Sequence, residues 1–154
     1  MNVEVRKLTQ EDAEPFLDLI HLFRDVLETG PEAGVRPEHR QRLLERADFM
    51  VFVARLDHQV VGGLTAYVLM QIHSEKPVVY LYDIAVHPTW QGQGIGTELL
   101  RQLMQYCGRL GMEELFVQAD QEDTQAIDFY RTTGGAARQV IHFTYPLNGS
   151  HGQF

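Results

Sequence analysis

The stretch Val86-His87-Pro88-Thr89-Trp90-Gln91-Gly92-Gln93-Gly94-Ile95-Gly96-Thr97 decides the fold of this chain. It follows an almost continuous apolar run, 78–86, which predicts a central strand buried on both faces. It precedes a helical pattern that extends to about Arg109, with Ile95, Leu99 and Leu103 in register. A strand, a glycine-rich turn and a helix in this order are typical of an anion site, because the first amides of a helix have no intrahelical acceptor.

The three alternating glycines narrow the kind of anion site. Glycine permits unusual backbone angles and lets a phosphate approach the amides closely. No Lys-Ser or Lys-Thr follows, which excludes a nucleotide-triphosphate loop, and Gly92-x-Gly94-x-Gly96 lacks the spacing of the dinucleotide fingerprint. The pattern therefore predicts a diphosphate site that belongs to neither of these two classes. The alternative is a loop without a ligand, although glycines inside a helix would cost ~1 kcal/mol each.

The rest of the chain predicts a mixed α/β protein with a largely antiparallel first half. The alternation from Val3 to Leu8 indicates a first strand. Thr9 then suits a helix N-cap, with Asp12 as the capping-box acid. The inward face of that helix is predicted to hold Phe16, Leu17, Ile20, Phe23 and Leu27. Further elements are predicted as a helix from Pro37 to about Arg46, a hairpin of strands at 49–56 and 60–70, a strand at 114–119, a helix at 123–131 and a last strand at 139–145.

The composition is that of a globular chain of 154 residues, expected to form one domain over 1–154 with a flexible tail at 148–154. Its 21 acidic and 13 basic residues give a formal net charge of −8, which argues against nucleic acid and suits a small cationic partner. The polar start lacks a signal-peptide pattern, and no apolar run approaches the ~20 residues of a membrane helix, so we expect a cytoplasmic protein. Cys107 is the only cysteine and is expected to be a small core residue; we predict no metal site.

Two signatures resemble those of the GNAT N-acetyltransferase superfamily. Gln91 to Gly96 resembles its acetyl-CoA signature, and Asp83-Ile84-Ala85-Val86-His87-Pro88 before it matches as well. Ala126-Ile127-Asp128-Phe129-Tyr130, followed by Gly134, resembles the second family signature, the helix after the fifth strand. The pair of signatures is specific, and the order of elements extends the resemblance over nearly the whole chain.

A narrower resemblance is to aminoglycoside 3-N-acetyltransferases of type I. It rests on Gly62-Gly63-Leu64-Thr65-Ala66-Tyr67-Val68-Leu69, on Tyr80-Leu81-Tyr82-Asp83-Ile84-Ala85-Val86, on Phe116-Val117-Gln118-Ala119-Asp120 and on the ending Val140-Ile141-His142-Phe143. Those enzymes acetylate one amine of a polycationic antibiotic sugar. The resemblance therefore implies the 3-amino group of an aminoglycoside as the acceptor and a role in antibiotic resistance.

The superfamily resemblance implies an α/β (α+β) GNAT fold, with a mixed, mostly antiparallel central sheet of about six to seven strands, about four flanking helices and splayed central strands. Acetyl-CoA would be the cosubstrate, and a homodimer is expected because relatives are commonly dimeric. The backbone of Ile84, Ala85 and Val86 would pair with the pantetheine arm. The diphosphate would be held by the amides of Gln91, Gly92, Gln93, Gly94, Ile95, Gly96 and Thr97. Many relatives carry asparagine after the fifth strand, and Gln121-Glu122-Asp123-Thr124 stands here, which leaves the arm's polar partner open.

Asp83 is the first candidate for the general base. It is a charged residue inside an apolar strand, which is costly unless the side chain lines a cleft or meets a cation such as the acceptor amine. Partial burial would also raise its pKa and make it a better base. A structural salt bridge is the alternative. Asp120 is the second candidate and His142 the third.

Tyr130 is the residue that the resemblance implies as the acid for the departing thiolate; the alternative is a core aromatic residue beside Phe129. Substrate binding is assigned to Asp83 and to the acidic cluster Asp120, Glu122 and Asp123, because converging carboxylates suit a polycationic amine. Glu28 and Glu32 could add to this acidic cluster, although solvated loop positions are the better interpretation for both.

The resemblance thus implies direct acetyl transfer to an amine in a ternary complex. Other acceptors stay open, namely a polyamine, an amino acid or a protein N-terminus. A non-catalytic acyl-CoA-binding sensor is the alternative from another class.

Overall fold

The computed structural model describes residues 2–29 and 34–148, and the chain divides into two compact units, Met1–Gln118 and Ala119–Phe154. The predicted contribution of Glu32 and nearly all of the predicted flexible tail lie outside the described residues.

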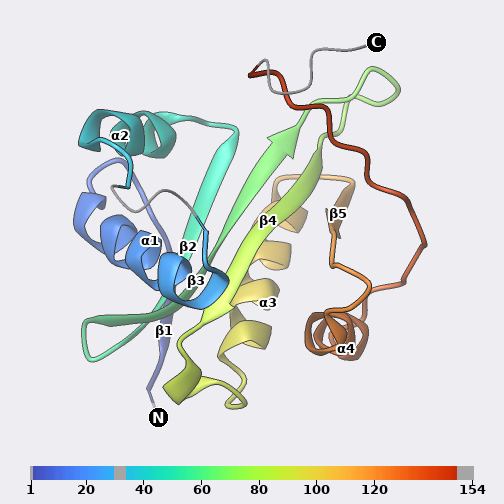
Figure 1. Ribbon diagram of the computed structural model, residues 1–154. Coiled ribbons are helices and arrows are strands. Elements are labelled where there is room, and N and C mark those ends of the chain that lie inside the picture. The colour runs from blue at the N-terminus through green and yellow to red at the C-terminus, as the bar shows by residue number, and fades with distance from the viewer. Residues whose placement is uncertain (1, 30–33, 149–154) are drawn as a thin grey trace. The chain divides into compact units, whose positions relative to one another are not determined.

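The first unit is a five-stranded sheet with helices on both faces (Figure 1). Its elements are β1 (Glu4–Lys7), α1 (Ala13–Leu27), α2 (Pro37–Glu45), β2 (Phe49–Leu56), β3 (Gln59–Leu69), β4 (Val78–Val86), the short 3₁₀ turn η1 (Pro88–Trp90), α3 (Ile95–Arg109) and β5 (Glu114–Val117). The strands lie in the order β1-β2-β3-β4-β5, antiparallel up to β4, whereas β5 is parallel to β4. Helices α1 and α2 cover one face and α3 covers the other.

The prediction of a mixed, mostly antiparallel sheet is confirmed, but the predicted six to seven strands are wrong for the described residues, which form five. The missing strand is the one predicted at 139–145, where the backbone has no regular secondary structure. Alternating apolar side chains provide strand propensity, but a strand forms only where a neighbour accepts and donates its backbone hydrogen bonds. The sequence pattern of 139–145 does not show whether such a neighbouring strand is present.

Helix α1 buries a different stripe from the one predicted. Its buried residues are Phe16, Leu19, Leu22 and Phe23, whereas the expected Leu17, Ile20 and Leu27 are only partly buried. The physical reason lies in β3: a Cβ built on Gly63 would come within 2.5 Å of Leu19 Cδ1. The glycine thus lets the helix approach the sheet closely, and this contact sets the rotation of α1.

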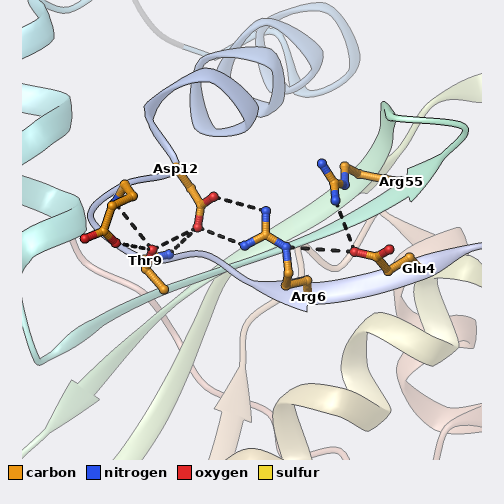
Figure 2. Close-up of polar contacts among 6 residues, drawn as sticks. Glu4, Arg6, Thr9, Asp12 and Arg55 are labelled. Carbon is orange, nitrogen blue, oxygen red and sulfur yellow. Dashed lines mark hydrogen bonds and ion pairs between the residues drawn. The ribbon is translucent and has the colours of Figure 1, made fainter.

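The start of α1 also differs from the prediction, because Thr9 is not its N-cap. The helix begins at Ala13 and its N-cap is Asp12, whose side chain makes no capping bond to the helix. Instead the Asp12 carboxylate turns back, accepting bonds from the Thr9 amide at 2.7 Å and from Arg6 Nη1 at 2.9 Å (Figure 2). The acid of the expected capping box therefore closes a turn before the helix and ties it to β1.

The second unit contains α4 (Thr124–Thr132), whose N-cap Asp123 accepts a hydrogen bond from the Ala126 amide at 3.1 Å. The helix ends at a turn in which Gly134 has a φ of 103° and the Gly135 amide donates to Tyr130 O. This helix agrees with the predicted 123–131 within one residue.

Candidate active site

The glycine-rich turn has the geometry of an anion site. Gly92 and Gly94 have φ values of 75° and 85°, and a Cβ built on either would meet no atom within 4 Å. Glycine is therefore required by the backbone angle, and the space beside the turn is open. Gly94 is the N-cap of α3, and the first helical bond is the one that Glu98 N donates to Gly94 O. The amides of residues 95–97 precede that bond and have no i−4 carbonyl within the helix.

Two contacts fix this turn relative to β4. Gln91 Nε2 donates to Val86 O at 2.9 Å, which ties the turn to the end of the strand. Ile95, 3% exposed, anchors the first residue of α3 in the core. The turn is thus held rigidly at both ends while Gln91 to Gly94 stay exposed.

The edge of β4 next to this turn lacks a β5 partner. The parallel pairing of β4 with β5 begins at Val78–Glu114 and ends at Leu81–Val117, so residues 82–86 continue alone on that side. On its other side β4 stays paired with β3 up to Gly62–Val86. The hydrogen-bonded pairing of β4 with β5 thus ends before residues 84–86, which agrees with the predicted separation of the central strands. The backbone of Ile84, Ala85 and Val86 has no β5 partner.

A β-bulge interrupts β4 at Tyr82, and the sequence reasoning missed it. Thr65 pairs with Asp83 but Ala66 pairs with Leu81, which leaves Tyr82 as an extra residue. Bulges re-aim side chains and are common beside active sites. The apolar spacing of β4 could have indicated the bulge. Leu81 and Ile84 pair with Ala66 and Leu64 and so share one face, whereas residues three apart in a regular strand lie on opposite faces.

Asp83 follows the bulge and lies on the face of the sheet that α1 covers. Thr65, its strand partner, is 6% exposed and donates its hydroxyl to Asp83 Oδ2 at 2.7 Å. Burial raises the pKa of Asp83, and the Thr65 hydroxyl opposes that rise. None of the ion pairs among residues 2–29 and 34–148 includes Asp83. Within these ranges the salt-bridge alternative therefore has no support, and the carboxylate is suited to receive a proton or an external cation.

An aromatic row crosses the same face beside Asp83. Phe49 pairs with Tyr67, Tyr67 with Tyr80, and Tyr80 with Phe116, so one residue of each of β2, β3, β4 and β5 contributes. The Tyr80 and Phe116 rings stack at 4.7 Å, and the bulge residue Tyr82 contacts both Tyr67 and Tyr80 edge-on. We name these five residues the aromatic row.

Tyr130 belongs to the second unit. Its ring contacts Phe129, and burial, together with the nearby Asp123, raises its pKa to about 12. A thiol has a pKa near 8.5, so full proton transfer from this phenol to a thiolate would be uphill by about 5 kcal/mol. A hydrogen bond to a developing thiolate has no such cost.

The remaining predicted residues divide between the two units. Asp120, Glu122 and Asp123 are all exposed at the start of the second unit, and Asp123 also serves as the N-cap of α4. Convergence of these acids on Asp83, and of Asp83 on Tyr130, stays a prediction because it involves both units. His142 lies in an irregular segment, and Glu28 is the left-handed C-cap of α1. Cys107 is buried, as expected, and its pKa is raised to about 11.

Neither a metal site nor a membrane-spanning helix is found in the described part of the chain. It contains no cluster of three or more metal-ligating side chains, and none of its helices is long and apolar enough to cross a membrane.

Residues 12–134 match the Acetyltransferase (GNAT) family. The chain belongs to this family. It is similar to an aminoglycoside acetyltransferase from an uncultured soil metagenomic sample, solved in complex with sisomicin, with 46% identity, a TM-score of 0.91 and coverage of 94% of this chain and 96% of that one. It is 28% identical to an aminoglycoside N(6′)-acetyltransferase type 1 of Stenotrophomonas maltophilia, over 95% of both chains.

A more distant match is the ribosomal protein bS18 alanine N-acetyltransferase of Escherichia coli K12, 27% identical over 55% of this chain and 56% of that one. The GNAT protein described here is thus an N-acetyltransferase resembling aminoglycoside acetyltransferases, and GNAT acetyltransferases use acetyl-CoA. The resemblance to the 3-N type needs correction, because the matching relative is of the N(6′) type. Short shared strand segments show the family but leave open which amine of the acceptor reacts.

Proposed function

We propose that this GNAT enzyme acetylates an amino group of an aminoglycoside, using acetyl-CoA in a ternary complex, and that the 6′-amine is the acceptor. The observation that carries the proposal is the arrangement of β4: Asp83, whose carboxylate has no ion-pair partner within residues 2–29 and 34–148, follows a bulge and precedes a strand edge that leads into the glycine turn. The similarity to an aminoglycoside acetyltransferase at 46% identity supports the substrate class. The N(6′) relative supports the position.

The cosubstrate fits the first unit. The amides from Gln91 to Thr97 would bind the diphosphate, because the turn is open and the α3 dipole favours negative charge there. The backbone of Ile84 to Val86 would bind the pantetheine arm along the edge that β5 leaves unpaired. An arm bound there as an added strand directs its thioester toward the bulge and Asp83.

Asp83 and Tyr130 account for the proton transfer and the hydrogen bond that the reaction needs. Asp83 accepts a proton from the ammonium group of the acceptor, and the amine lone pair then attacks the thioester carbonyl carbon. The carbon–sulfur bond breaks, and the electron pair leaves with sulfur. We assign Tyr130 a hydrogen bond to this thiolate rather than full proton donation, because the pKa of Tyr130 is raised to about 12. The thiolate takes its proton from the amine nitrogen.

Neomycin and paromomycin test the proposal, because they differ only in carrying an amine or a hydroxyl at the 6′ position. Thiol release from acetyl-CoA should occur with neomycin and be lost with paromomycin. Equal turnover of both would overturn the 6′ assignment and favour the 3-amine. No turnover of either, or of sisomicin, would overturn the aminoglycoside class.

The bS18 relative justifies one further acceptor in the same assay. A peptide with an N-terminal alanine should give no thiol release above background. Turnover of the peptide in preference to neomycin would assign the enzyme to protein N-termini instead. Spermidine is the control acceptor that carries several amines, as neomycin does, but has no sugar ring.

A further inference from the structure

The aromatic row changes from buried to exposed along its length. At the β2 end Phe49 is 7% exposed and packs on Phe16 of α1, with ring centroids 6.4 Å apart. At the bulge Tyr82 is 59% exposed, although its ring is held edge-on by Tyr67 and Tyr80 at 5.5 and 5.4 Å. An exposed ring between two supporting rings has a fixed orientation and therefore loses little conformational freedom when a ligand covers it.

The bulge places this ring beside the candidate base. Tyr82 and Asp83 are consecutive, and Asp83 shares the face of Tyr67 and Tyr80, because its partner Thr65 lies two residues before Tyr67 on β3. The electrostatic effect of Asp83 contributes to raising the pKa of both Tyr67 and Tyr80, which confirms that the carboxylate and the row are close. In a regular strand Tyr82 would share the face of Tyr80 but Asp83 would point to the opposite face, so the bulge brings the carboxylate to the face of the row.

Charge distinguishes the Tyr82 end of the row from the pocket beside Tyr67. A pocket of about 390 Å³ adjoins Tyr67 and is lined by His39, Arg42, Leu43, Arg46 and Asp48. Its one carboxylate, Asp48, is already paired with Arg46 at 2.8 Å. A cationic sugar is therefore favoured at the Tyr82 end, where Asp83 provides a carboxylate that no cation of the described ranges pairs with, and where the tyrosine face attracts ammonium groups.

We propose that Tyr82 is a stacking platform for an aminosugar ring of the acceptor, orienting the ring so that its amine meets Asp83. This inference rests on the proposed function, and it adds a positioning residue that selects ring-bearing amines over flexible polyamines. A ring face in contact with Tyr82 fixes the plane of the sugar, and the carboxylate then fixes its rotation in that plane. The linear chain of spermidine offers no such plane.

Calorimetric binding of neomycin to Tyr82 variants tests the inference, with KM for neomycin measured in parallel. We expect Tyr82→Phe and Tyr82→Trp to bind as tightly as the native enzyme or more tightly, because the ring is retained. Tyr82→Leu should weaken binding by about two- to five-fold, the size expected for an exposed cation–π contact. KM for acetyl-CoA should not change. Equal Kd values for the leucine and phenylalanine variants would overturn the inference.

The controls separate this inference from the proposed function. Ile72→Ala, at a position 93% exposed in the loop after β3, should leave both constants unchanged. Tyr82→Met provides a second ring-free side chain if the leucine variant does not fold. Neomycin binding that follows the ring order without acetyl transfer would overturn the proposed function and keep the platform. Acetyl transfer with neomycin Kd values that do not depend on the ring at position 82 would overturn the platform and keep the proposed function. Absence of both binding and transfer would overturn both.

Discussion

Asp12 and Asp83 are both aspartates of the first unit, but the fold treats their carboxylates in opposite ways. Asp12 accepts two bonds from Arg6, at 2.9 and 3.1 Å, and two from Thr9, one from its amide and one from its hydroxyl (Figure 2). These bonds, led by those from Arg6, lower the pKa of Asp12 to about 2. Asp83 accepts one bond, from the Thr65 hydroxyl, and burial raises its pKa.

The difference separates a carboxylate with a structural role from one that is a candidate for a reactive role. The Asp12 charge is satisfied within the fold and stabilises it. The Asp83 charge is half-buried without a cation among the described residues, so the folded state carries a cost that an external ammonium group would remove. Four experiments test whether the two carboxylates differ in this way.

The largest effect is expected for Asp83→Asn on catalysis. If Asp83 is the general base, kcat/KM for neomycin should fall by about 10²- to 10⁴-fold, because asparagine cannot accept the proton. Steady-state thiol release measures this. Asp12→Asn is the matched control and should keep native kcat/KM once its folded fraction is taken into account. An Asp83→Asn enzyme within about threefold of the native rate would contradict the base assignment.

The second effect concerns stability and belongs to Asp12. Asp12→Asn should lower the free energy of unfolding at pH 7 by about 1–3 kcal/mol, the range for hydrogen bonds to charged groups. Since the folded-state pKa lies below the unfolded value of 3.8, this stabilisation is present above about pH 4 and is lost as the pH falls toward 2. Urea denaturation across that range measures it. A pH-independent difference between the two proteins would show that packing, and not the charge, is responsible.

The contrast between the two aspartates was only half visible in the sequence. Asp83 was recognisable as a candidate because a charged residue interrupts an apolar strand, and the glycine spacing predicted a diphosphate site. The structural role of Asp12 was misassigned: the sequence suggested a capping box, but Arg6, six residues earlier, became its partner through the geometry of the β1–α1 turn.

Most helices and strands were predictable because their periodicity is local. The inward face of α1 was not, since it depends on the close approach of Leu19 to Gly63 across the sheet. The aromatic row was missed for the same reason: Phe49, Tyr67 and Phe116 become neighbours only through strand register. The strand predicted at 139–145 failed because propensity does not provide a pairing partner.

The third experiment measures the cost of Asp83 in the folded state. Its folded-state pKa is raised above the unfolded value, so ionisation weakens the fold as the pH rises from 3.8 through the folded-state pKa. Asp83→Asn should therefore be more stable than the native enzyme at pH 7, by roughly 0.5–2 kcal/mol, as is common where activity and stability compete. The gain should disappear below about pH 4, as followed by urea unfolding. A less stable variant at pH 7 would mean that the charge has a partner in the fold.

The smallest effect is expected for Thr65→Val, which removes the one donor that favours the charged form of Asp83. The pKa of Asp83 should then rise further, because burial is no longer opposed. Since the base must be deprotonated to act, the acidic limb of kcat/KM should move to higher pH, with a loss of activity on that limb and little change on the plateau above it. Thr65→Ser retains the hydroxyl and should keep the native profile. Because both variants are assayed with the same amine, titration of the acceptor cancels between them, and an unchanged limb in the valine variant would show that the limb does not report Asp83.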